Sequence, residues 1–190
     1  MALLILDRDG VINEDSDRYI RSLDDWVAIP GSIAAIADLS KAGFRIAIAT
    51  NQSGLSRGYF TLDTLEQIHA NMCRLVEEEG GHIAGIFYCP HLPDEGCNCR
   101  KPATGLLQAI EAELGESAIG AFFIGDSLKD LQAAHAHGCQ PVLVKTGKGA
   151  KTLATLDADK ASADPQLTQL NGTPVYHNLM EASRAILNAR

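Results

Sequence analysis

Two carboxylates stand two positions apart near the start of the chain, in the stretch Asp7-Arg8-Asp9-Gly10. One of them could attack phosphorus and form an aspartyl phosphate. The other could protonate the leaving oxygen and then activate a water molecule. A carboxylate that approaches a phosphate dianion is repelled, so this chemistry needs a cation, and Mg²⁺ is typically held by one or two carboxylates together with substrate oxygens. The same residue types also suit a polar turn, so this stretch alone leaves both interpretations open.

Three further polar stretches offer groups that could bind phosphate or the cation. Thr50 and Asn51 begin a run of small polar residues, whose hydroxyl and N–H groups suit phosphate. Lys101 precedes a proline and could place a positive charge on a phosphate oxygen, although a solvated surface lysine is the alternative. Asp126 and Asp130 could complete a magnesium site, while the alternative for Asp126 is the N-cap of a helix.

Four potential metal ligands lie close together in the loop Cys89-Pro90-His91 to Cys97-Asn98-Cys99. Three thiolates and one imidazole make up the tetrahedral set of a structural Zn²⁺ site. The residues between them are few and polar, so a metal rather than packing would have to fix this loop and the Arg100 and Lys101 that follow it. Unconnected thiols in a loop are the alternative.

The candidate site residues follow the expected strands of an α/β fold. Apolar runs predict strands at 3–6, 44–49, 83–88, 121–124 and 142–144, and a short last strand at 174–176. Helical patterns predict helices at 32–42, 62–79, 106–114, 128–137 and 179–187, with a weak helix and a loop over 150–174. Alternating strands and helices predict a parallel sheet that is covered on both faces. Ligands bind beyond the carboxyl ends of such strands, where these candidate residues stand.

Length and composition limit the possible functions. The chain has 190 residues, 46% of them hydrophobic, which predicts a single domain over residues 1–190 without a large cap domain. The net charge of −8 disfavours a nucleic-acid partner. We find no apolar segment that approaches the roughly 18 residues of a membrane span, and the apolar start before Asp7 is too short for a signal peptide. We therefore expect a cytoplasmic monomer without membrane partners.

The motifs Asp-x-Asp-Gly, Thr-Asn, Lys-Pro and Gly-Asp-x-x-x-Asp occur in this order, each after an expected strand. This arrangement resembles the haloacid dehalogenase superfamily of phosphatases over residues 3–148, which implies a Rossmann-like doubly wound parallel sheet. The resemblance further implies a role for each matching residue, as follows: Asp7 as nucleophile, Asp9 as general acid and base, Thr50 as phosphate-binding hydroxyl, Lys101 as the lysine that steadies nucleophile and phosphoryl group, Asp126 as Mg²⁺ ligand beside Asp7 and the Asp9 carbonyl, and Asp130 as its support.

The cysteine loop narrows the resemblance to the bacterial D-glycero-D-manno-heptose 1,7-bisphosphate 7-phosphatases and the related histidinol-phosphate phosphatase domains. The first group implies removal of the C7 phosphate of a small phosphorylated sugar, on the route to ADP-heptose and the lipopolysaccharide core. It also implies substrate contacts from Asn51, Arg57 and Arg100, with both arginines on the second phosphate. Ser127 departs from the pattern, since some heptose enzymes carry lysine there.

Two other functions remain as alternatives. Histidinol-phosphate phosphatase would use the same chemistry. A phospho-receiver signalling domain also has a parallel α/β fold, but its acceptor aspartate follows the third strand, where this chain has Cys89.

Overall fold

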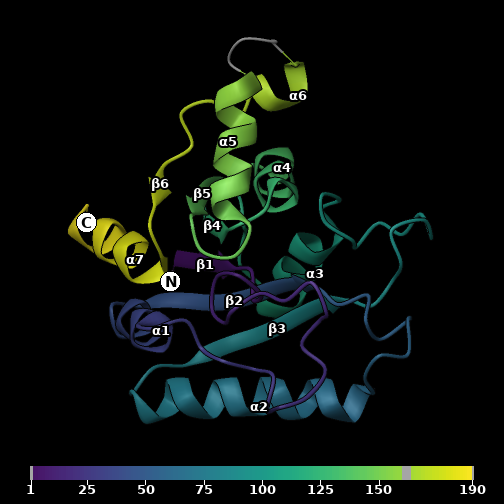
Figure 1. Cartoon of the computed structure of the whole chain (residues 1–190). Helices are drawn as coiled ribbons and strands as arrows, with labels where there is room; N and C mark the ends of the chain where they lie inside the picture. The colour runs from purple at the N-terminus through teal and green to yellow at the C-terminus, as the bar shows by residue number, and fades with distance from the viewer. Residues whose placement is uncertain (1, 160–163, 190) are drawn as a thin grey trace.

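Six parallel strands form the centre of the fold in the computed structural model of the chain, which describes residues 2–159 and 164–189. The strands are β1 (Ala2–Leu6), β2 (Phe44–Asn51), β3 (Ile83–Cys89), β4 (Phe122–Gly125), β5 (Gln140–Val144) and β6 (Val175–Tyr176). They lie in the order β3-β2-β1-β4-β5-β6, and all neighbours are parallel (Figure 1). The predicted parallel sheet is thus confirmed, including its short last strand.

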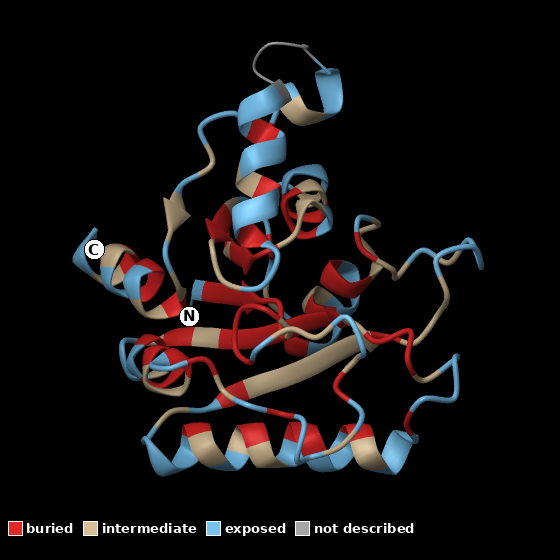
Figure 2. Cartoon of the chain, viewed as in Figure 1, coloured by how far each residue is buried: buried red, intermediate tan, exposed pale blue. Residues whose placement is uncertain are grey.

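Helices cover both faces of the sheet, as expected for a doubly wound fold. They are α1 (Ser32–Lys41), α2 (Leu62–Glu78), α3 (Gly105–Leu114), α4 (Leu128–His137), α5 (Gly149–Asp159), α6 (Pro165–Thr168) and α7 (Leu179–Asn188). Because successive strand residues point to opposite faces, Leu4 and Leu6 of β1 join a core with α1, α2 and α7, whereas Leu3 and Ile5 join a second core with α3 and α4. Figure 2 shows β1 and β2 as mostly buried, whereas the outer face of α2 is exposed.

Two differences from the sequence-based boundaries concern the site. Strand β2 continues through Thr50 and Asn51, which pair with Tyr88 and Cys89 of β3. These polar residues are therefore the last residues of strands rather than the first of loops, and the sheet fixes their backbones. In the stretch expected as a weak helix and a loop, α5 and α6 are present, and residues 160–163 lie outside the described residues.

The strand order reverses direction at β1, whose neighbours are β2 on one side and β4 on the other. The connections from these two strands leave toward opposite faces, and ligands bind at such a switch point. Asp7 follows β1 and Asp126 follows β4, so both acids stand at this point. Trp26, in the loop between β1 and α1, is buried and packs in the core. Within the described residues, no helix has the length and apolar character to span a membrane.

Candidate active site

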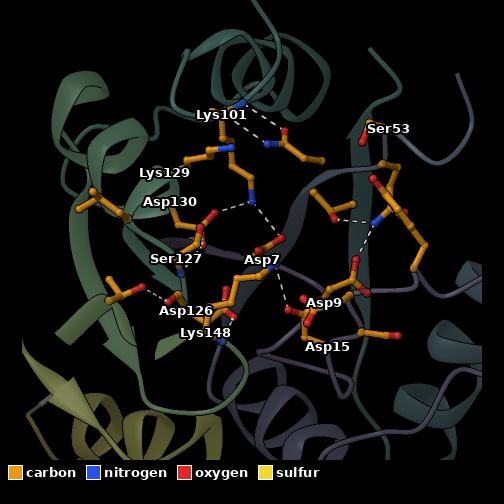
Figure 3. A pocket seen from close by; sticks show the side chains of 18 of the residues that line it. Asp7, Asp9, Asp15, Ser53, Lys101, Asp126, Ser127, Lys129, Asp130 and Lys148 are labelled. Atoms are coloured by element: carbon orange, nitrogen blue, oxygen red, sulfur yellow. Dashed lines mark hydrogen bonds and ion pairs between the residues drawn. The ribbon is translucent and has the colours of Figure 1, made fainter. Parts of the chain in front are cut away.

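The carboxyl ends of β1, β2 and β4 open into a cavity of about 540 Å³. Three of the predicted residues, Asp7, Lys101 and Asp126, line it and are labelled in Figure 3. Thr50 lines the same cavity from β2. Residues that are far apart in the sequence therefore converge at the switch point of the sheet, where the motif order predicted a site.

The ammonium group of Lys101 connects three structural elements in the floor of the cavity. Its Nζ lies 2.9 Å from Asp7 Oδ1 and 2.6 Å from Asp130 Oδ1, and it donates a hydrogen bond to the carbonyl of Ala49 at 2.7 Å. Burial would lower the pKa of Lys101, but the charges of Asp130 and Asp7 raise it, so this lysine stays charged. The alternative of a solvated surface lysine is wrong, because the residue is 2% exposed.

Asn51 fixes the backbone of Lys101. Its amide Nδ2 donates to the Lys101 carbonyl at 3.2 Å, and its Oδ1 accepts from the Lys101 N–H at 3.1 Å. A strand-end side chain thus pairs with both backbone groups of the lysine, which stands 50 residues later in the chain. Asn51 also lines the cavity, where the sequence predicted a substrate contact.

Three buried carboxylates lie close together, and one ammonium group, that of Lys101, pairs with two of them; this excess of negative charge fits a divalent cation. One oxygen each of Asp7, Asp126 and Asp130 lies within 4.8 Å of the others. Burial and the charge of Asp130 raise the pKa of Asp7 to about 7, against the opposing effect of Lys101. Burial, Asp130 and Asp7 raise the pKa of Asp126 to about 8. Hard cations such as Mg²⁺ prefer such oxygen donors, so the donor set fits the ion.

The hydrogen bonds of the three acids show which oxygens could bind the ion. Asp7 Oδ1 accepts from the Arg8 N–H and from Lys101, and Asp126 Oδ2 accepts from the Lys148 N–H at 2.7 Å. The second oxygen of each accepts no hydrogen bond from the described residues. Both oxygens of Asp130 are engaged, one by Lys101 and the other by Ser127. Asp7 and Asp126 are therefore the candidate ligands, and Asp130 fits the supporting role.

The N-cap of α4 is Ser127, so the alternative that Asp126 caps this helix is wrong. Asp130 forms the reciprocal half of the capping box, with its Oδ2 accepting from the Ser127 N–H at 3.0 Å and from the Ser127 hydroxyl at 2.7 Å. The departure of Ser127 from the heptose-enzyme pattern thus has a local structural reason, since serine is a good N-cap.

Two glycines press against the carboxylate of Asp126. Gly10 and Gly147 both have a positive φ, at 84° and 56°, which disfavours any residue with a side chain. A Cβ on Gly10 would lie 2.1 Å from Asp126 Oδ2, and one on Gly147 would lie 2.2 Å from the same atom. The hydroxyl of Thr146 also donates to the Gly10 carbonyl at 2.6 Å. The loops after β1 and β5 thus hold Asp126 in place from both sides.

We expect Mg²⁺ to stabilise the protein more at pH 8 than at pH 5.5. Asp7 and Asp126 have raised pKa values, so the metal-free fold holds protons that the unfolded chain has lost, and its stability falls as pH rises through about 4 to 8. The ion needs both carboxylates ionised and competes with these protons. Thermal unfolding should show an increase in Tm of roughly 5–10 °C at 100 times Kd and pH 8, and a clearly smaller increase at pH 5.5. Equal increases at both pH values would contradict the proposed ligands.

The carboxylate of Asp9 is held by four donor groups on three side chains. Arg8 donates through Nε and Nη2 at 2.8–3.0 Å, Asn13 through Nδ2 at 2.9 Å and Gln52 through Nε2 at 2.8 Å. Burial raises the pKa of Asp9, but Arg8 and these hydrogen bonds outweigh it and keep the pKa below its ordinary value. Gln52 also donates to the Thr50 hydroxyl at 2.9 Å. Asp9 is therefore an ionised, firmly oriented carboxylate at the rim of the cavity.

The four ligands predicted for zinc come together beside the site. Sγ of Cys99 lies 3.1 Å from Sγ of Cys89 and 3.2 Å from His91 Nδ1, and Sγ of Cys97 lies 3.7 Å from that of Cys89. All four ligand atoms lie within 4.8 Å of one another. The alternative of unconnected thiols is wrong, and the donor set fits a tetrahedral Zn²⁺.

The cysteine cluster reaches the cavity through Arg100. The guanidinium of Arg100 donates through Nη1 to the carbonyl of His91 at 3.2 Å, and Arg100 lines the cavity. Arg57, the other arginine expected on substrate, is exposed and does not line the cavity in this structure. Its predicted substrate contact stays a prediction.

We expect loss of the cysteine cluster to weaken substrate binding more than the chemical step. Cys99→Ser should release the loop that holds Arg100, and KM for a bisphosphate substrate should rise about tenfold, the value of one hydrogen bond to a charged group. Cys73→Ser, on α2 outside the cluster, is the control. The measurement is KM and kcat together with the zinc content of each purified variant. An unchanged KM in a zinc-free Cys99→Ser protein would contradict this coupling.

Several residues that line the cavity were not singled out from the sequence. Lys151, Thr152 and Thr155 lie on α5, and Lys129 lies on α4. The pKa of Lys129 is lowered by burial and by the nearby charges of Arg100 and Lys148, so these cations share one region. Lys148, in the loop after β5, lines the same cavity. The α5 residues lie in a stretch without strong periodicity, and no motif marks them.

Part of the loop between β1 and α1 also lines the cavity. Its contribution comes from Asp15, Ser16, Asp17 and Tyr19. The loop is joined to the opposite rim by an ion pair of 3.0 Å between Asp15 Oδ2 and Lys148 Nζ, two residues that are labelled in Figure 3.

Comparisons with known proteins agree with this geometry. The family model for haloacid dehalogenase-like hydrolases matches residues 2–138, and a second model, described as HAD-hydrolase-like, matches residues 98–181. The chain is 61% identical over 153 residues to a protein of Pseudomonas putida named D-glycero-beta-D-manno-heptose-1,7-bisphosphate 7-phosphatase, covering 80% of this chain and 87% of the relative. A Pseudomonas aeruginosa protein of the same name is 59% identical over 152 residues, covering 80% and 85%.

A solved structure is also similar over the whole chain. The D,D-heptose 1,7-bisphosphate phosphatase of B. bronchiseptica, crystallised with magnesium and phosphate, superposes with a TM-score of 0.90 at 45% identity and covers 100% of both chains. The corresponding enzyme of Burkholderia thailandensis gives a TM-score of 0.71 at 37% identity, with coverage of 98% and 99%.

Proposed function

The chain belongs to the haloacid dehalogenase-like hydrolases, and we propose from this that it is a Mg²⁺-dependent phosphatase that removes the C7 phosphate of D-glycero-D-manno-heptose 1,7-bisphosphate. The family predicted from the motifs is thereby confirmed. The observation that carries the reaction type is the convergence of Asp7, Lys101 and Asp126 in one cavity. The assignment of the substrate rests on the similarity to proteins that are named heptose bisphosphate phosphatases.

We propose that Asp7 is the nucleophile and attacks phosphorus with one of its carboxylate oxygens. The ion pair with Lys101 fixes the orientation of this carboxylate. The hydroxyl of Thr50 and the ammonium group of Lys101 hold the phosphoryl group. Asp7, Asp126 and the Asp9 carbonyl would hold Mg²⁺, which would supply positive charge against the repulsion between carboxylate and phosphate oxygens. Most of the acceleration then comes from positioning and from charge neutralisation.

We propose that Asp9 transfers the protons of the reaction. Asp9 is ionised in the free enzyme, so it takes up a proton when the substrate binds. It then gives this proton to the sugar oxygen as the bond to phosphorus breaks, which leaves an aspartyl phosphate on Asp7. It then accepts a proton from the water molecule that hydrolyses this intermediate. The position of Asp9 at the rim of the cavity, on the loop that carries Asp7, supports both roles.

The second phosphate of the substrate would bind to the cations at the wall of the cavity. Arg100, Lys129, Lys148 and Lys151 all line it. Arginine suits this role because its planar group meets phosphate with two parallel hydrogen bonds. These cations give the wall local positive charge, which favours an anionic substrate against the overall net charge of −8.

A substrate panel tests this proposal. We expect phosphate release from heptose 1,7-bisphosphate in the presence of Mg²⁺, and ³¹P NMR should identify heptose 1-phosphate as the product. Both anomers of the bisphosphate and histidinol phosphate belong in the panel. Turnover of histidinol phosphate alone would refute the heptose assignment and leave the phosphatase chemistry intact.

We further propose that the protein acts as a cytoplasmic monomer and as one domain over residues 1–190, without nucleic-acid or membrane partners. Its proposed substrate is a phosphorylated metabolite, and the acidic composition supports the absence of nucleic-acid binding. Size-exclusion chromatography with light scattering tests the oligomeric state, and a mass twice 20.3 kDa would refute the monomer.

A further inference from the structure

A buried arginine and a buried histidine support Asp9, and neither is among the residues that line the cavity. The side chain of Arg8 is 0% exposed, which is unusual for an arginine. Its Nε and Nη2 donate to Asp9, and its Nη1 lies 3.2 Å from Nε2 of His69. His69 comes from the middle of α2, 61 residues away in the sequence, and is 9% exposed.

The hydrogen-bond direction between the two residues follows from their charges. An arginine nitrogen can only donate. Burial and the charge of Arg8 lower the pKa of His69 to about 3, so the imidazole is neutral and its Nε2 accepts the hydrogen bond. The ring also packs near Tyr88 of β3, at 6.1 Å between ring centroids. His69 is therefore fixed by α2 and β3, and it fixes one end of the guanidinium plane.

We propose that Arg8 and His69 are positioning residues for proton transfer: His69 sets the plane of the Arg8 guanidinium, and Arg8 sets the orientation of the Asp9 carboxylate. This inference rests on the proposed role of Asp9 as general acid and base. Asn13 and Gln52 also donate hydrogen bonds to the Asp9 carboxylate, and Gln52 donates to the phosphate-binding hydroxyl of Thr50 as well. Proton transfer needs donor and acceptor within hydrogen-bond reach, so a carboxylate free to rotate would lose rate without losing substrate affinity.

Two substrates with different leaving groups distinguish a role in proton transfer from a purely structural role of His69. Heptose bisphosphate has a poor, alkoxide leaving group, whose departure needs a proton from Asp9. In contrast, 2,4-dinitrophenyl phosphate has a stable phenolate leaving group that needs none. The parameter kcat/KM reports on the first chemical step for both. We expect His69→Ala to lower kcat/KM about tenfold for heptose bisphosphate, with KM unchanged, and by less than about twofold for the dinitrophenyl ester.

Two further variants make the experiment decisive. His69→Gln offers an amide oxygen that can accept from Arg8, and it should recover most of the lost rate on heptose bisphosphate. His82→Ala removes an exposed histidine near the end of α2 and should behave as the wild type. Equal losses on both substrates, no loss on either, or no recovery in His69→Gln would each overturn the inference. Failure of the wild-type enzyme to release phosphate from either substrate would instead overturn the proposed function.

Discussion

Asp7→Asn abolishes turnover and leaves the fold intact: this is the largest effect we expect from a single substitution. Without a nucleophilic carboxylate, no aspartyl phosphate forms, and kcat should fall by roughly four orders of magnitude or more, as for other nucleophile variants. The amide is nearly isosteric and can still accept hydrogen bonds from Arg8 N–H and Lys101 at the position of Oδ1. Phosphate release at saturating substrate and Mg²⁺ is the measurement.

The fold of this variant gives an independent check. Burial and Asp130 disfavour the ionised form of Asp7, so a neutral amide should not lower Tm in the absence of metal. Rapid quenching with ³²P-labelled substrate should label the wild type and leave Asp7→Asn unlabelled. Asp63→Asn, an exposed acid in the first turn of α2, serves as the matched control. A labelled or active Asp7→Asn protein would refute the assigned nucleophile.

Lys101→Met should reduce both activity and stability. The substitution removes the one ammonium group between Asp7 and Asp130 and leaves two buried carboxylates without their cation. Breaking a buried ion pair by removing one partner costs about 3–5 kcal/mol, and protonation of Asp7, whose pKa is already raised to about 7, keeps the loss near the lower value. Loss of one group that stabilises transition-state charge lowers kcat by about 10²–10³.

Urea unfolding and steady-state kinetics measure these two effects separately. Lys41, at the exposed end of α1, forms a surface ion pair with Asp38, and Lys41→Met should change stability by less than about 1 kcal/mol. Mg²⁺ should recover part of the stability of Lys101→Met, because it neutralises the same acids. If Lys101→Met had the same free energy of unfolding as the wild type, the three contacts of Lys101 Nζ would make no net contribution to stability, and the prediction would be wrong.

The sequence predicts the fold and the centre of the site for one physical reason. Parallel strands that are buried on both faces read as continuous apolar runs, and their carboxyl ends must lie at the same edge of the sheet. Chemical groups that follow such runs, such as Asp7 and Asp126, are therefore expected to lie together from the order of the motifs alone. The short spacing of the cysteine loop has a similar effect, since its four ligands cannot separate far.

Contacts made by packing between distant elements could not be predicted in this way. The pair of Arg8 and His69 depends on how deeply α2 packs onto the sheet, and residue type alone places an arginine at the surface. Asn51 looked like a substrate ligand, and its bonds to the Lys101 backbone depend on the path of the chain after the cysteine cluster. The contribution of α5 to the cavity depends on the turn after β5, which no motif marks.

The two glycines on either side of Asp126 also limit which positions of this enzyme can be varied in protein engineering. Neither Gly10 nor Gly147 has room for one more carbon atom, so mutant libraries should keep both positions constant. Lys151 and Thr155 are exposed on α5 and border the same cavity. Substrate range can therefore be redesigned from that helix, while the parts that cleave the ester bond remain as they are.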